Sequence, residues 1–146
     1  MLDAPSEEDI MSVCNQIFEE TEDIETMLFG FSVGLESDYD LPILLSQLEP
    51  TISNIEKRRR FEISFAGQGL EFDVIGVFGE SGSVEIEKRP FSNCTSDTFE
   101  VPIPVLWENF EVFLRQIVDS AHEKNISSNV IRFFEVQLER IRKYVV

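Results

Sequence analysis

The chain has 146 residues, a formal net charge of −16 and a hydrophobic content of 42% that includes thirteen phenylalanines. This length and apolar content suit one packed domain, residues 1–146, and argue against a disordered chain. The excess of acid disfavours direct binding to nucleic acid or to anionic membranes, because both need clustered Lys and Arg. No apolar run approaches the roughly 20 residues that span a bilayer.

The acidic residues are unevenly distributed along the chain. Residues 1–56 hold 14 acids and neither Lys nor Arg, so this part carries −14. Residues 57–146 hold the other 14 acids and all 12 bases, and carry −2. A random order of these charges rarely gives so long a run of one sign. We expect the first part to repel itself, which weakens the fold and favours solubility.

Residues 6–21 have the pattern of an amphipathic helix. Ser6 can cap it, the acids that follow suit the positive end of the helix dipole, and apolar residues recur three and four positions apart. Residues 27–35 then alternate large apolar side chains with others, which predicts a strand. The glycines in this segment leave a helical continuation as the alternative.

The segment from Leu41 to residue 56 is predicted to be helical, with Asp40 as its cap. Pro50 lies in the middle, so we expect a kink or two short helices. The helix ends at the basic run 57–60, where cations face the negative end of the helix dipole.

Three strands of an antiparallel meander are predicted over residues 61–87, where apolar and polar side chains alternate. Turns at 67–69 and 80–82 separate these strands. Residues 99–103 alternate as well, but Pro102 restricts them to a sheet edge or an extended linker.

Two antiparallel helices, over about residues 105–121 and 127–144, complete the predicted elements. The predicted fold class is α+β, with a small antiparallel β-sheet packed against N-terminal and C-terminal helices. We expect the core to contain Phe65, Phe72, Val74, Phe110, Phe113, Phe133 and Phe134.

The glycine-rich turns carry no enzymatic signature. Gly67-Gln68-Gly69 lacks the third glycine and the following helix of a dinucleotide-binding loop, so a hairpin turn is the better interpretation. Residues 79–83 fall one position short of a nucleophile elbow and also precede a strand.

Metal and thiol chemistry are disfavoured as well. His122 is the only histidine, so a zinc site would lack its other nitrogen ligands. Cys14 and Cys94 form no CxxC pair, and Cys14 falls on the apolar helix face, where inert burial is usual. Asp38 and Asp40 have calcium-ligand spacing, but proline and isoleucine follow where the loop needs an oxygen and a glycine. We predict no enzyme, metal or cofactor.

The predicted function is the docking of a basic protein partner on the acidic segments. A solvated helix end explains the acidic run alone, but not the absence of bases from 56 residues. The polar face of the meander is a possible second surface, with Glu62, Glu71, Asp73, Glu85 and Glu87. The predicted docking residues are Glu19, Glu20, Glu22, Asp23, Glu25, Glu36, Asp38 and Asp40.

Three classes of protein fit this composition. The first is an inhibitor of the kind that a bacterial immunity protein represents, which neutralises a nuclease-type toxin and acts as a monomer. The second is an acidic export chaperone for an effector protein, usually a dimer, and the third is a small enzyme of unknown class. The first residues lack a basic and an apolar signal segment, so we expect a cytoplasmic protein.

Overall fold

The computed structural model describes residues 3–19, 22–65, 70–92 and 95–145. These residues form an α+β fold with two antiparallel sheets, the hairpin β1–β2 and a sheet in the order β3-β4-β5-β6. The predicted fold class is therefore confirmed. The elements are α1 (Glu7–Ile17), β1 (Asp23–Leu28), β2 (Phe31–Glu36), α2 (Asp40–Ser46), α3 (Leu48–Glu56), β3 (Phe61–Ser64), β4 (Phe72–Phe78), β5 (Ser83–Pro90), β6 (Asp97–Pro102), α4 (Ile103–Glu123) and α5 (Asn129–Arg142).

The first helix begins as predicted and ends early. The backbone N–H of Asp9 donates to Ser6 Oγ at 3.1 Å, which confirms Ser6 as the N-cap. Helix α1 ends at Ile17, because Phe18 takes an extended backbone conformation. The acidic run that follows therefore leads into a strand and does not extend the helix.

The prediction of one strand over residues 27–35, or of a helix there, is wrong. The chain forms a hairpin that turns at Phe29 and Gly30, both with positive φ. Two successive positive φ angles are what a tight hairpin turn requires, and they match the twist of the flanking strands. A Cβ at position 30 would lie 2.7 Å from Val101 Cγ2, so only glycine fits against β6.

The expected break in the next helix is confirmed, at a slightly different place. Helix α2 ends at Ser46 and α3 begins at Leu48, while Pro50 lies in the first turn of α3, where it is tolerated. Gln47, between the helices, exchanges two side-chain hydrogen bonds with the backbone of Ser64 on β3. The break thereby joins the helices to the four-stranded sheet.

The meander is confirmed, and the predicted strand near residues 99–103 is its edge strand β6. Strand β4 pairs with β3 on one side and with β5 on the other, and β5 pairs with β6. Phe61 lies directly opposite Gly76, and its ring covers the glycine so closely that a Cβ there would be 2.2 Å from Cε1. The predicted turn at 67–69 lies outside the described residues.

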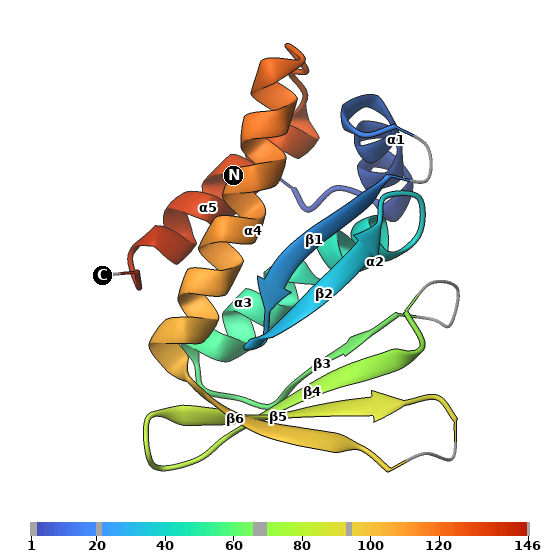
Figure 1. Cartoon of the computed structure of the whole chain (residues 1–146). Helices are drawn as coiled ribbons and strands as arrows, with labels where there is room; N and C mark the ends of the chain where they lie inside the picture. The colour runs from blue at the N-terminus through green and yellow to red at the C-terminus, as the bar shows by residue number, and fades with distance from the viewer. Residues whose placement is uncertain (1–2, 20–21, 66–69, 93–94, 146) are drawn as a thin grey trace.

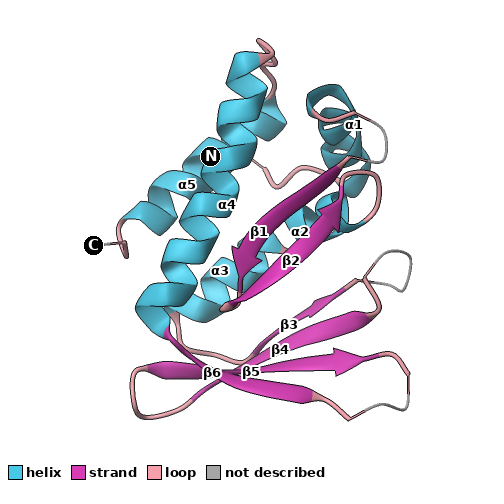
Figure 2. Cartoon of the chain, in the orientation of Figure 1, coloured by secondary structure: helices cyan, strands magenta, loops and turns pink. Residues whose placement is uncertain are grey.

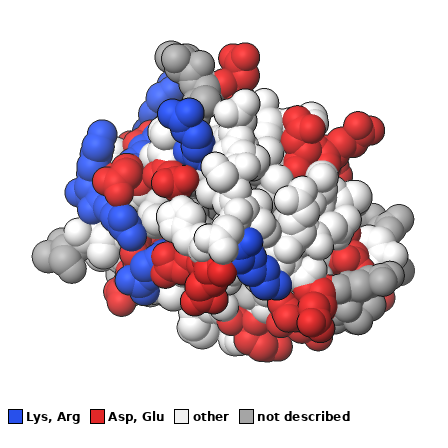
Figure 3. Space-filling view, turned by 90° about the horizontal axis from the view of Figure 1, so that it is seen from above, with Lys and Arg blue, Asp and Glu red and all other residues white. Residues whose placement is uncertain are grey.

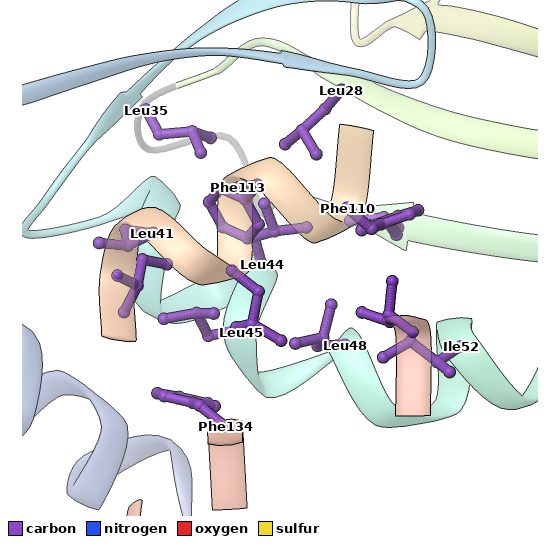
Figure 4. Packing of buried hydrophobic residues seen from close by; sticks show 14 of the residues in the cluster. Leu28, Leu35, Leu41, Leu44, Leu45, Leu48, Ile52, Phe110, Phe113 and Phe134 are labelled. Carbon is purple, nitrogen blue, oxygen red and sulfur yellow. The ribbon is translucent and has the colours of Figure 1, made fainter. Parts of the chain in front are cut away.

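The helices and the hairpin lie on one side of the four-stranded sheet (Figures 1 and 2). In Figure 4, Phe113 of α4 lies between the leucines of the hairpin, Leu28 and Leu35, and Leu44 of α2. Of the helices in the described part of the chain, none has both the length and the apolar character that crossing a bilayer requires. All seven predicted core residues are buried: Phe65, Phe72, Val74, Phe110, Phe113, Phe133 and Phe134.

Candidate functional site

The hairpin brings the two acidic segments of the sequence together. Asp23 at the start of β1 is the direct cross-strand partner of Glu36 at the end of β2. Beyond them, the buried Ser37 donates from its backbone N–H to the carbonyl of Glu22 at 3.0 Å and from Oγ to the carbonyl of Glu19 at 3.2 Å. The segments around residues 19–25 and 36–38 therefore lie side by side.

Asp40 has a different place from the other predicted docking residues. It is the first residue of α2, with Tyr39 as the N-cap residue and no side-chain cap, so its predicted capping role is wrong. Its carboxylate accepts hydrogen bonds from the backbone N–H of Glu36 at 3.0 Å and of Leu70 at 2.9 Å. With only 2% of its surface exposed, Asp40 fixes the loop from inside.

The other predicted docking residues that the structure describes carry negative charge at the surface. Glu19, Glu22, Asp23 and Glu25 are exposed, while Glu36 and Asp38 are half-buried. Among the described residues, neither Lys nor Arg forms an ion pair with any of the four exposed acids. Glu20 lies outside the described residues. The term acidic surface is used below for Glu19, Glu22, Asp23, Glu25, Glu36 and Asp38.

Many carboxylates elsewhere in the chain have cationic partners. In the view from above, Lys and Arg lie on the left and in the centre, whereas the right side shows carboxylates without them (Figure 3). Lys124, at the end of α4, donates to the carbonyl of Ile17 at the end of α1. Within the described residues, the ion pairs that Lys and Arg form are Glu49 and Glu56 with Arg140, Glu62 with Arg60, Glu87 with Arg89, Glu111 with Arg115 and Arg142, and Glu139 with Arg142.

A shallow groove of about 490 Å³ adjoins the acidic surface. Met11 and Asn15 line it from α1, Phe18 lines it from just after that helix, and Asp38 and Tyr39 line it from the loop before α2. Met11 is 39% exposed and Tyr39 is 44% exposed, so the groove presents apolar area to solvent. The groove therefore lies between α1 and the loop before α2.

Sequence reasoning missed this groove. Met11 lies outside the buried stripe of α1. A large apolar side chain on the polar side of an amphipathic helix was the available signal of this groove. The position of Tyr39 opposite α1 depends on the hairpin, which the sequence did not predict.

Cys14 and His122 are the described residues that thiol or metal chemistry would use. Burial raises the pKa of the Cys14 thiol to about 12, so it stays protonated and unreactive at neutral pH. His122 is exposed on α4, and its Nε2 lies 3.8 Å from a Glu135 oxygen. Within the described ranges, no group of three or more His, Cys, Asp or Glu side chains is placed to hold a metal ion. Cys94 lies outside them.

The other predicted acidic surface is the outer face of the four-stranded sheet. Glu62 and Glu87 flank the buried Ile75 in one cross-strand row, and Asp73 lies opposite Arg89 in another. Glu71 is exposed but precedes β4. This face differs from the acidic surface because Arg60 and Arg89 pair with its carboxylates.

In comparisons with known proteins, no protein-family model, curated protein or solved structure matches the chain.

Proposed function

We propose that this chain is a non-catalytic protein-binding module that docks a basic protein through the acidic surface and the groove beside it. The observation that carries the proposal is the opposed pair Asp23 and Glu36, with further exposed acids around it and no basic side chain paired with them in the described chain. Like charges at directly opposed strand positions destabilise a sheet. A surface that weakens its own fold is best explained by what it binds.

The arrangement of the groove supports a protein as the ligand. Protein interfaces commonly have an apolar centre that excludes water and a polar rim, and tyrosine and methionine are enriched in them. Here Met11 and Tyr39 provide the apolar centre, while Asp38 is on the rim. The partner would insert an apolar side chain between them and surround it with Lys and Arg.

Within this class, we propose an inhibitor that acts as a bacterial immunity protein does. A nuclease binds phosphates through clustered Lys and Arg, which makes its nucleic-acid site complementary to an acidic surface. Electrostatic attraction of this kind acts mainly on the association rate. The chain would cover the basic site of a toxin and keep nucleic acid out.

The experiment compares three immobilised proteins for capture from extracts of the source cells. They are the wild type, a double variant Asp23→Lys with Glu25→Lys, and a control, Glu80→Lys with Asp97→Lys. The control residues are exposed and lie at the four-stranded sheet, and both variants have the same net charge. We expect the wild type and the control to retain a basic protein that the first variant loses.

Kinetics with the purified partner then decide the mechanism. We expect the association rate to fall roughly ten-fold or more between low and physiological salt, with little change in the dissociation rate. An association rate that is flat with salt, or equal for all three proteins, would contradict docking through the acidic surface. A nuclease that stays active while bound would refute inhibition, and a stable homodimer would favour the export chaperone.

A further inference from the structure

The four-stranded sheet has an open edge at β6. Strand β5 pairs with one side of β6 in continuous register, and no strand of the described chain pairs with the other (Figure 2). From Asp97 to Glu100 every residue is exposed, and of the strand residues only Val101 is buried. In Figure 1 this edge lies at the opposite end of the molecule from α1 and the acidic surface.

The hydrogen-bond pattern identifies which backbone groups face outward. The N–H of Ile103 donates to the carbonyl of Gly82 at 3.2 Å, so these two residues form a hydrogen-bonded pair of the antiparallel ladder. Such pairs alternate along a ladder, which directs the backbone groups of Phe99 and Val101 toward β5. The N–H and C=O groups of Thr98 and Glu100 therefore point away from the sheet.

The position of Pro102 agrees with this assignment. It falls on an outward-facing position, where a residue without an N–H removes no ladder bond. Natural edge strands are usually protected by charged side chains, bulges or a covering segment. Strand β6 has regular pairing without a bulge, and its charged side chains, Asp97 and Glu100, repel an acidic strand but attract a basic one. Its outward groups therefore form a template for a basic strand.

A groove of about 440 Å³ runs beside this edge on the outer face of the sheet. Val77, which is 47% exposed, contributes apolar surface, and Thr98 lines the groove from β6. Glu85 and Glu100 are direct cross-strand partners in the same groove, so two carboxylates lie next to the outward-facing backbone groups. No Lys or Arg lines the groove.

We propose that β6 binds an extended, basic segment of another protein as a fifth strand of this sheet. Its backbone would pair with Thr98 and Glu100, its Lys or Arg side chains would lie near Glu85 and Glu100, and an apolar side chain would cover Val77. A second copy of this chain fits poorly, because its own β6 would bring Asp97 and Glu100 to the same edge.

The test uses two pools of peptides of about eight residues, an ordinary strand length. In one pool Lys or Arg alternates with varied apolar residues, and in the other Glu replaces the basic residues. We expect the immobilised chain to enrich the basic pool. Hydrogen exchange with the best binder should then slow at the Thr98 and Glu100 amides by roughly ten-fold or more. Equal enrichment of the pools, or unchanged exchange at these amides, would overturn the proposal.

Two variants separate strand pairing from simple charge attraction. Glu100→Pro removes an outward N–H that the fold does not use, so the protein should fold while peptide binding falls at least roughly ten-fold. Glu100→Gln keeps the N–H and should retain most of the binding. Circular dichroism checks the fold of each. Binding that is unchanged in Glu100→Pro, or self-association that this variant abolishes, would refute the proposed occupant.

This site does not depend on the acidic surface. The double variant Asp23→Lys with Glu25→Lys should bind the selected peptide as the wild type does, because its substitutions lie on the other sheet. A peptide that binds the wild type but not this variant would place the contact on the hairpin and refute pairing at β6. The outcomes for the two surfaces can therefore be distinguished.

Discussion

The acidic surface can be tested in the free protein, because like charges that oppose each other lower its stability. Asp23 and Glu36 hold directly opposed positions on β1 and β2, where side chains are about 5 Å apart. Two like charges at that distance repel by about 0.8 kcal/mol in water. A Debye length of about 8 Å at physiological ionic strength reduces this repulsion to about 0.4 kcal/mol.

Replacing Asp23 by lysine converts the repulsion into an attraction of similar size. We expect Asp23→Lys to raise the free energy of unfolding by about 0.9 kcal/mol at physiological salt. Asp23→Asn removes the repulsion without adding an attraction and should give about half of that gain. In about 1 M salt, where the Debye length is about 3 Å, the gain from lysine should fall to about 0.3 kcal/mol.

Urea unfolding followed by circular dichroism measures these differences at both salt concentrations. Glu80→Lys is the matched control, because it changes the net charge equally at an exposed position in the turn between β4 and β5. The gain of Asp23→Lys over this control reports the opposed pair itself. The reasoning would be wrong if that gain were absent at physiological salt or persisted undiminished in about 1 M salt.

Three further predictions concern the fold. Gly76→Ala places a Cβ against the Phe61 ring and should cost about 1–3 kcal/mol in urea unfolding, and less in a Phe61→Leu background. Phe113→Ala removes a fully buried side chain and should cost about 3–5 kcal/mol by the same measurement. The Arg140 guanidinium lowers the pKa of the Glu56 carboxyl in the folded protein. The pair therefore stabilises the fold at pH values above the unfolded pKa of glutamate, about 4.3. This stabilisation is lost as the pH falls through the lower pKa of the folded state. Arg140→Met should therefore cost about 1–2 kcal/mol near pH 7, and pH-dependent melts should show the difference from wild type shrinking in acid.

The meander could be predicted because its strands alternate cleanly and a glycine turn separates β4 from β5. The hairpin β1–β2 could not, although Ile24, Thr26 and Leu28 do alternate with exposed residues. Its turn at Phe29 and Gly30 lacks the Asn-Gly or Asp-Gly pair that signals such turns, and positive φ is unusual for phenylalanine. The alternation of apolar residues with others therefore predicted one strand that ran through the turn.

For the candidate site, the sequence predicted the acidic segments but not the packing of the residues around them. The absence of bases before residue 57 identified the acidic segments, but their side-by-side position depends on the hairpin, which was not predicted. The burial of Asp40 could not be foreseen, since it depends on the N–H of Leu70, thirty positions further along the chain. Tyr39 lines the same groove as Met11 because of tertiary packing, so the exposed position of Met11 on α1 was the only local signal of this groove among the described residues.

The bonds that hold the acidic segments together bear on how the acidic surface can change during evolution. Ser37 donates hydrogen bonds to the main-chain carbonyls of Glu19 and Glu22, so the carboxylates of these two residues take no part in the bonds. Side chains at those two positions can therefore be exchanged one at a time without loosening the loop they stand on. If the acidic surface docks a partner as proposed, single substitutions at Glu19 and Glu22 would change its specificity, while Ser37 and Asp40 remain under the constraint of folding.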